Sequence, residues 1–152
     1  MRLFIALDCN GFKPVLDPIV EKLEGPGIKK VSTYHLTLAF FKNADPKEIL
    51  SQLNLSYEPI KVTLQGLGHF NKRVIWVGVS PQKPILQLKK EIDMQLGLND
   101  DRYNPHITLA RLKQKIVLPQ IKVPEESAYP RLFLFKSTLT KEGPIHEKLH
   151  EF

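Results

Sequence analysis

The tetrapeptide His-x-Thr-x occurs twice in this chain, with an aliphatic residue at every x, as His35-Leu36-Thr37-Leu38 and His106-Ile107-Thr108-Leu109. Each copy lies in an apolar run typical of a β-strand. Because side chains alternate between the faces of a strand, the histidine and threonine of each copy share one face, about 7 Å apart, and the aliphatic residues share the other. Two such strands side by side would gather two imidazoles and two hydroxyls in one cleft. That set suits a phosphodiester, with one imidazole on either side of the phosphorus.

Acid–base cleavage of a phosphodiester needs a base for the nucleophile, an acid for the leaving oxygen, and donors for the non-bridging oxygens. Histidine can fill either of the first two roles at neutral pH, since its unperturbed pKa is near 6.5. The hydroxyls of Thr37 and Thr108 can donate hydrogen bonds to charged oxygens, worth about 1.5–3 kcal/mol each. One histidine must start neutral and the other protonated, which predicts a bell-shaped pH profile. This scheme needs no metal ion and no other cofactor.

Other interpretations of these histidines stay open. They could be hydrogen-bonded polar residues of half-buried strands, although a structural histidine has no need of a threonine two residues later. They could bind zinc, but the tetrapeptides contain no carboxylate and no second histidine follows at a metal-binding spacing. Covalent catalysis by Cys9 is less favoured, because no histidine is near it in sequence. We therefore predict a metal-free site made of His35, Thr37, His106 and Thr108.

The segments around the two tetrapeptides repeat at the same offset of 71 residues that separates His35 from His106. A strand-like apolar run starts near Leu3 and another near Val74, and an amphipathic stretch with helical spacing follows each. Each half of the chain thus predicts a strand, a helix and a motif strand in that order. We expect a single domain over residues 1–152, with duplicated halves at roughly 1–70 and 71–152.

Further elements are predicted between and after the repeated ones. Asp45-Pro46 starts a short helix that runs to Leu53, and residues 60–67 alternate as in a strand that ends at Gly66-Leu67-Gly68. Residues 132–140 predict a last strand, after which Gly143-Pro144 turns the chain toward its end. The histidines outside the tetrapeptides lie in a Gly-rich turn or near the end and are expected to be solvated; they are His69, His146 and His150.

The composition is that of an ordinary globular protein, with 42% hydrophobic and 25% charged residues in a chain of 152. No apolar run approaches the ~18 residues of a membrane span, and the first residues lack a signal-peptide pattern. A single cysteine excludes an internal disulfide and fits a reducing compartment, so we expect a cytoplasmic protein with no membrane partner. The net charge of +6 would attract a polyanion, but charge alone does not separate nucleic-acid-binding proteins from other basic proteins.

The chain resembles the 2H phosphoesterases, which are named after two His-x-Thr/Ser-x motifs. Within them it is similar to the RNA 2′,3′-cyclic phosphodiesterases, historically called 2′-5′ RNA ligases. The likeness covers nearly the whole length in short, ordered pieces, which are residues 2–7, 35–38, 66–70, 74–78, 105–111, 137–140 and 143–144. One departure is Phe41-Lys42, where the family usually has Leu-Gly after the first motif strand.

The resemblance implies an α+β, bilobal fold, in which two pseudo-symmetric halves each hold an antiparallel sheet facing a central groove, with helices outside. It also implies hydrolysis of a 2′,3′-cyclic phosphate at an RNA end to a 2′-phosphomonoester. His35 would then be the proton donor to the departing 3′ oxygen, and His106 the proton acceptor that activates water. Thr37 and Thr108 would hold the phosphoryl oxygens. The expected partners are RNA or nucleotides with 2′,3′-cyclic phosphate ends, and we expect a monomer.

Arg111 and Tyr103 are weaker candidates for substrate binding. Arg111 could contact phosphate, but strict alternation from His106 puts it on the face of Ile107, where a structural ion pair is an equally good interpretation. Tyr103 could stack on a base at the rim of the groove, or pack into the core beside Pro105.

Two other functions are compatible with these residues. The same chemistry in reverse, with a hydroxyl replacing water, would join halves of transfer RNA as a 2′-5′ RNA ligase. A non-catalytic RNA-binding module would use the positive charge alone, and would not need a matched pair of imidazoles. The abundance of water makes hydrolysis the main prediction.

Overall fold

The computed structural model describes residues 1–152, and two antiparallel sheets dominate it. In the first, here called sheet A, the strand order is β3 (His35–Phe41), β1 (Arg2–Asp8), β8 (Leu132–Thr140) and β9 (Gly143–Glu151). In the second, sheet B, the order is β2 (Lys29–Lys30), β6 (His106–Arg111), β5 (Val74–Ser80), β4 (Val62–Phe70) and β7 (Ser127–Ala128). The α+β fold with two antiparallel sheets is as predicted.

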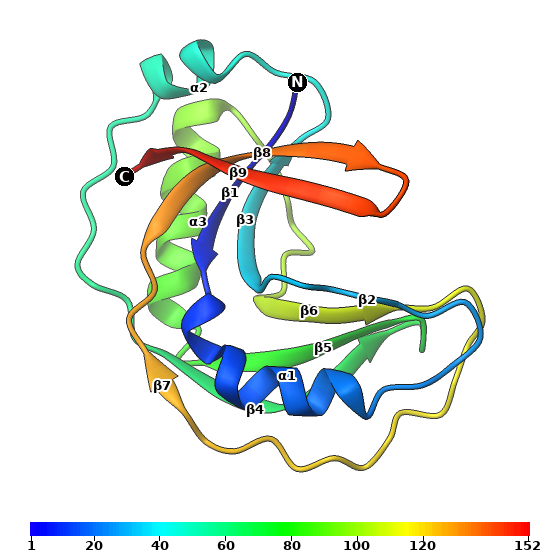
Figure 1. The fold of residues 1–152 in the computed structure, drawn as a ribbon. Helices are drawn as coiled ribbons and strands as arrows, with labels where there is room; N and C mark the ends of the chain where they lie inside the picture. The colour runs from blue at the N-terminus through cyan, green and yellow to red at the C-terminus, as the bar shows by residue number, and fades with distance from the viewer.

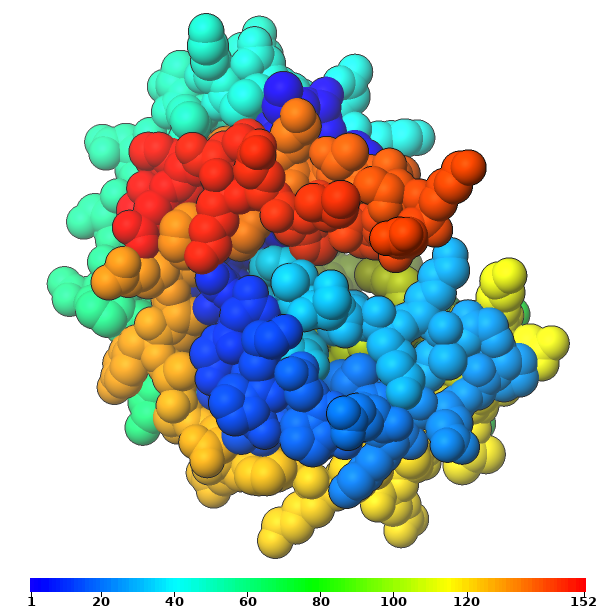
Figure 2. All heavy atoms as spheres, in the orientation of Figure 1, coloured from blue at the N-terminus to red at the C-terminus, as the bar shows by residue number.

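The two sheets meet where β3 and β6 begin, and from there they open away from each other (Figure 1). Strands β3 and β6 pack against one another, so the two motifs lie at the junction of the sheets. Figure 2 shows a hollow between the orange and red β8–β9 hairpin and the blue segment that contains α1 (Lys13–Glu21) and β2. The central groove implied by the resemblance is therefore present.

Helices cover the outside of the sheets. Helix α3 (Lys83–Leu96) packs against β3, helix α1 follows the 3-10 turn η1 (Asn10–Phe12) and packs against β6, and α2 (Pro46–Gln52) packs on α3. One hydrophobic cluster joins these elements and includes residues from both sheets. Because one cluster serves both sheets, their relative position is set by core packing.

The helix ends follow their sequence signals. The predicted cap of α2 is confirmed, since the Asp45 carboxylate accepts a 2.9 Å hydrogen bond from the backbone N–H of Lys47. Proline stands in the first turn of all three α-helices, where its missing N–H is not needed. Gly97 ends α3 with φ of 66°, a conformation that favours glycine.

The prediction for the end of the chain was wrong. Residues 132–140 are not the last strand, because residues 143–151 form β9, the outer strand of sheet A. The residues of β9 are mostly exposed and polar, so the strand lacks the apolar alternation that marks β8. Its stability comes from the main-chain ladder to β8. Strand β4 also runs past Gly68 to Phe70, and the two-residue strands β2 and β7 were not predicted.

Both sheets combine strands from the two halves of the chain. Strand β4 lies before residue 71 yet pairs with β5 in sheet B, and β8 lies near the end of the chain yet pairs with β1 in sheet A. Apart from β2, the order in each sheet is the same: a motif strand, then β1 or its counterpart β5, then a long strand and an edge strand. None of the helices is long and apolar enough to cross a bilayer.

Candidate active site

Each motif begins its strand and places its histidine and threonine on the face away from the core. His35 is the first residue of β3 and His106 the first residue of β6. Leu36 and Ile107, the residues that follow them, are completely buried, whereas Thr37 is exposed. The predicted division of each motif into a polar and a core face is therefore confirmed.

A β-bulge interrupts both motif strands at the same place. In sheet A, Leu38 has no partner between the Ala6–Thr37 and Ile5–Ala39 pairs. In sheet B, Leu109 is left out in the same way, between the pairs that Thr108 and Ala110 form with β5. Two consecutive residues are buried at each bulge, so the alternation of faces resumes one residue later.

The bulge corrects the prediction for Arg111. Strict alternation placed Arg111 on the face of Ile107, but the extra residue returns it to the face of His106 and Thr108. Its side chain is exposed and forms no ion pair, so the structural-ion-pair interpretation is wrong. Arg111 therefore contributes an unneutralised positive charge to the motif face of sheet B.

His106 is held in one orientation and one tautomer. Its Nδ1 lies 2.7 Å from the backbone oxygen of Asn104, and since a carbonyl oxygen only accepts, Nδ1 carries the proton. The neutral ring thus keeps its lone pair on Nε2. Phe70 packs edge-on against the ring at 4.9 Å between centroids, and Trp76 lies at 6.0 Å.

Burial lowers the pKa of His106, and the charge of Arg111 lowers it further, while the hydrogen bond to Asn104 acts in the opposite direction. The pKa of His106 therefore lies below the ordinary value of 6.5. The ligand-free protein therefore holds His106 mainly neutral at pH 7, the state that a proton acceptor requires.

His35 sits among aromatic rings of sheet A. Its ring centroid lies 5.3 Å from that of Phe4, 4.8 Å from that of Phe135 and 4.8 Å from that of His146. Burial lowers the pKa of His35 to about 4, and repulsion from His146 adds to this. Asp8, directly opposite His35 in the β1–β3 ladder, works against the shift. Without a ligand, His35 is neutral at pH 7.

His146 is a residue of the site that the sequence prediction missed. It was expected to be solvated, but β9 places it half-buried against His35 and Phe4, with its Nδ1 3.3 Å from Thr33 Oγ1. A signal was available in the spacing of His146 and Lys148, which a strand would put on one face. That signal requires β9 to be recognised as a strand first.

Tyr103 ties the two motifs together. Its hydroxyl donates a 2.7 Å hydrogen bond to the backbone oxygen of Thr37, across the junction between the sheets. Its ring packs against the hydrophobic core, with the ammonium of Lys89 5.0 Å from the ring centroid. Of the two interpretations offered for Tyr103, these contacts favour core packing.

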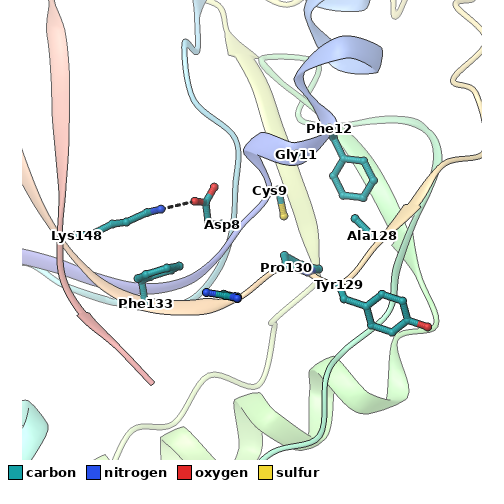
Figure 3. A pocket seen from close by; sticks show the side chains of 10 residues that line it. Asp8, Cys9, Gly11, Phe12, Ala128, Tyr129, Pro130, Phe133 and Lys148 are labelled. Carbon is teal, nitrogen blue, oxygen red and sulfur yellow. Dashed lines mark ion pairs between the residues drawn. The ribbon is translucent and has the colours of Figure 1, made fainter.

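A pocket of about 320 Å³ opens beside Asp8, the ladder partner of His35 (Figure 3). Lys148 reaches across it from β9 to form a 2.7 Å ion pair with Asp8, and lies 4.2 Å above the ring of Phe133. The pocket contains neither motif histidine. Cys9 lines it but is 1% exposed, and burial raises the pKa of its thiol, so Cys9 is not an activated nucleophile.

No three side chains of His, Cys, Asp or Glu are grouped as metal ligands. His69 accepts a 3.0 Å hydrogen bond from the backbone N–H of Lys72 at the end of β4, and His150 packs against Phe152. His35 and His146 pack on each other and on aromatic rings of sheet A, whereas His106 packs on aromatic rings of sheet B.

Comparison with known proteins gives one consistent result. Residues 13–136 match the 2′-5′ RNA ligase superfamily. The chain is 34% identical to the RNA 2′,3′-cyclic phosphodiesterase of Methanocaldococcus jannaschii, over 100% of both chains. It is 32% identical to the protein of the same name from Thermotoga maritima, over 99% of this chain and 94% of that one.

Solved structures agree on the fold. TT0787 of Thermus thermophilus superimposes with a TM-score of 0.76 at 26% identity, over 100% of this chain and 97% of that chain. E. coli LigT complexed with 3′-AMP superimposes with a TM-score of 0.80 at 22% identity, over 99% of this chain and 96% of that chain.

Proposed function

This chain belongs to the 2′-5′ RNA ligase superfamily, the 2H phosphoesterases, and from that premise we propose that it hydrolyses 2′,3′-cyclic phosphate ends of RNA to 2′-phosphomonoesters without a metal ion. One relationship carries the proposal: β3 and β6 pack against each other, and each carries a histidine and a threonine on its face away from the core. The names of the relatives from M. jannaschii and T. maritima support the substrate class.

In the proposed reaction, His106 is the proton acceptor. Its Nε2 takes a proton from water, whose oxygen forms a bond to phosphorus. The fixed Nδ1–H of His106, held by Asn104, keeps Nε2 available for this step. Positioned proton transfer of this kind contributes roughly 10²–10⁴-fold to the rate.

His35 is the proposed proton donor. As the bond from phosphorus to the 3′ oxygen breaks, His35 gives its proton to that oxygen, and the phosphate stays on the 2′ oxygen. The nearby carboxylate of Asp8 favours the charged form of His35, and no backbone oxygen fixes its tautomer. Because an anion within a few ångströms favours the charged imidazole, binding of the phosphate would supply the protonated state that the ligand-free protein lacks.

The two threonines complete the proposed site. The hydroxyls of Thr37 and Thr108 would donate to the non-bridging oxygens, one from each sheet. Arg111, on the same face as Thr108, would add positive potential to the site, consistent with its lowering of the pKa of His106. Tyr103 is assigned a supporting position, since its hydroxyl already binds the backbone of Thr37.

The proposal extends to the organisation of the chain. Residues 1–152 would act as one domain and as a monomer in the cytoplasm, built from halves at roughly 1–70 and 71–152. The single hydrophobic cluster shared by both sheets supports one domain, and the recurring strand order supports an internal duplication.

A turnover assay tests the function directly. The protein is mixed with a 2′,3′-cyclic mononucleotide and, separately, with RNA that ends in a 2′,3′-cyclic phosphate, both with EDTA, and products are separated by ion exchange. We expect a 2′-phosphomonoester from wild type, and at least a 100-fold loss in His35→Ala and in His106→Ala. His150→Ala, which removes an exposed histidine outside the hollow, is the matched control.

The same assay separates the alternatives. Loss of turnover in EDTA that returns with a divalent cation would contradict metal independence. A joined product from paired RNA ends would indicate a ligase. RNA binding that persists in both histidine variants, with no turnover in wild type, would indicate a non-catalytic binding module.

A further inference from the structure

Positive charge gathers at one end of sheet B. Residues 25–44, 59–90 and 102–124 contain no Asp or Glu, and they supply β2, the β4–β5 turn and the end of β6. Six exposed cations of β2, the β4–β5 turn and the end of β6 form a cluster that we call the basic rim: Lys29, Lys72, Arg73, Arg111, Lys113 and Lys115. None of them takes part in a salt bridge.

Backbone hydrogen bonds hold the three segments together. Lys29 lies opposite Arg111 in the β2–β6 ladder. The backbone N–H of Leu112 donates to the oxygen of Arg73 at 2.7 Å, and that of Ile116 donates to the oxygen of Lys72 at 3.1 Å. Figure 1 shows β2, the far end of β6 and the β4–β5 turn at the same end of the sheet. The rim is therefore one continuous surface.

The basic rim continues the motif face of β6. Arg111 shares that face with His106 and Thr108 because of the bulge at Leu109, and the residue directly opposite it, Lys29, lies on the same face. Arg111 lies five steps along the strand from His106, a span of roughly 16 Å. A linear ligand that binds at the motif and follows β6 would therefore reach the basic rim.

Aromatic rings line the face between the motif and the rim. Trp76 lies opposite Thr108 and Phe70 lies opposite Val74, the partner of Arg111. The two rings are 5.4 Å apart between centroids, and Phe70 is 37% exposed. Aromatic rings next to cations are the surface on which single-stranded nucleic acid stacks its bases, whatever their sequence.

Sheet A differs at the position that corresponds to Arg111. At the position 71 residues before Arg111 it has Phe40, which lies opposite Phe4 on the motif face. The cation nearest to His35, Lys148, is neutralised by Asp8. The motif face of sheet A is therefore more aromatic and that of sheet B more cationic, although Arg2 lies 5.1 Å from the ring centroid of Phe40.

We propose that the basic rim binds the nucleotides 5′ to the cyclic phosphate, so that the preferred substrate is an RNA strand rather than a mononucleotide; this rests on the function proposed above. A 2′,3′-cyclic phosphate occupies both hydroxyls of the terminal ribose, so the rest of the strand leaves only through the 5′ oxygen. Backbone phosphates of that strand meet Arg111, Lys29 and the cations beyond, and bases stack on Trp76 and Phe70.

Two triple variants with equal net charge test the rim. The rim variant is Lys29→Glu/Arg73→Glu/Lys115→Glu, and the control is Lys47→Glu/Lys83→Glu/Lys90→Glu, which reverses three exposed lysines on α2 and α3. Each is assayed with a 2′,3′-cyclic mononucleotide and with an RNA of about ten nucleotides that has the same end. Equal melting temperatures establish that both variants fold.

We expect wild type to show a higher kcat/KM for the RNA than for the mononucleotide. In the rim variant the RNA value falls at least tenfold and the slope of log kcat/KM against log salt becomes shallower by about 2, because each lost phosphate contact removes about 0.7. The mononucleotide value changes less than threefold, and the control variant keeps the RNA preference. Equal losses of kcat/KM for both substrates, or an equal loss in the control variant, would contradict the proposal that the basic rim binds the RNA strand.

A binding measurement separates failure of the rim from failure of the proposed reaction. Fluorescence anisotropy with a 5′-labelled RNA that ends in a 3′-phosphate needs no turnover. Weaker binding to the rim variant, with unchanged binding to the control, supports the rim even if neither cyclic substrate is hydrolysed. Unchanged binding to both variants contradicts it even if wild type is an active phosphodiesterase.

Discussion

His35 and His146 lie ring against ring, with centroids 4.8 Å apart and planes at 73°. Two imidazoles at this distance compete for a proton, because each charged ring disfavours the charge on the other. The other charges facing this pair are the carboxylate of Asp8 and the ammonium of Lys148. A residue that was expected to be solvated thus acts on the proposed proton donor.

Replacing His146 should raise the pKa of His35. His146→Phe keeps a ring against Phe4 but removes the repulsion, which is the second-largest cause of the lowered pKa, after burial. We expect the acid limb of the kcat/KM profile to move toward neutral pH, with little change in melting temperature. An acid limb at the wild-type position would show that His146 does not influence the titrating group.

The pH optimum of wild-type kcat/KM should lie below 6.5. That parameter reports the ionisations of the free enzyme, in which the pKa of His35 is about 4 and that of His106 is lowered. The active form has one histidine protonated and the other neutral, so its population peaks between the two pKa values. The optimum of kcat should be higher, because bound phosphate favours the charged imidazole. A kcat/KM maximum above pH 7.5 would contradict the assignment of His35 and His106 as the two titrating groups.

Removing either motif hydroxyl should weaken catalysis without affecting the fold. Thr37→Val and Thr108→Val preserve shape and the β-branched side chain, but remove a donor to charged oxygens worth about 1.5–3 kcal/mol, equivalent to about 10- to 150-fold in kcat/KM. Neither hydroxyl has a hydrogen-bond partner within the protein that its loss would disrupt. Losses of kcat/KM below threefold in both variants would show that the two hydroxyls do not contribute to catalysis.

Gly68→Ala should displace Trp76. A Cβ at residue 68 would overlap the Trp76 ring, which lies beside His106, whereas a Cβ at Gly66 meets nothing. We expect Gly68→Ala to cost roughly 1–3 kcal/mol of folding free energy and to lower kcat/KM for RNA, while Gly66→Ala leaves both near wild type. Chemical denaturation and turnover assays measure the two effects. Equal behaviour of the two variants would mean that the Trp76 ring can move freely.

Local patterns in the sequence predicted the motif faces and most helix and strand positions. The alternation of His35, Leu36 and Thr37 has the period of a strand, and the signal is complete within four residues. The start of α2 at Asp45 is likewise local, since the residue itself makes the capping contact.

What the sequence could not predict depends on pairing between distant strands. The bulge at Leu109 is defined only by its partners in β5, and it decides on which face Arg111 lies. The contact of His146 with His35 requires β9, β8, β1 and β3 to pair in that order. The hydrogen bond from Tyr103 to Thr37 likewise spans 66 residues.

The bulges at Leu38 and Leu109 make each motif strand intolerant of single-residue length changes. Deleting one residue there would restore plain alternation, turn the guanidinium of Arg111 toward the hydrophobic core and expose an aliphatic side chain in its place. Related sequences should therefore keep a constant spacing from the motif histidine to the strand end, and a one-residue gap at this point would mark a relative whose cationic side has been lost.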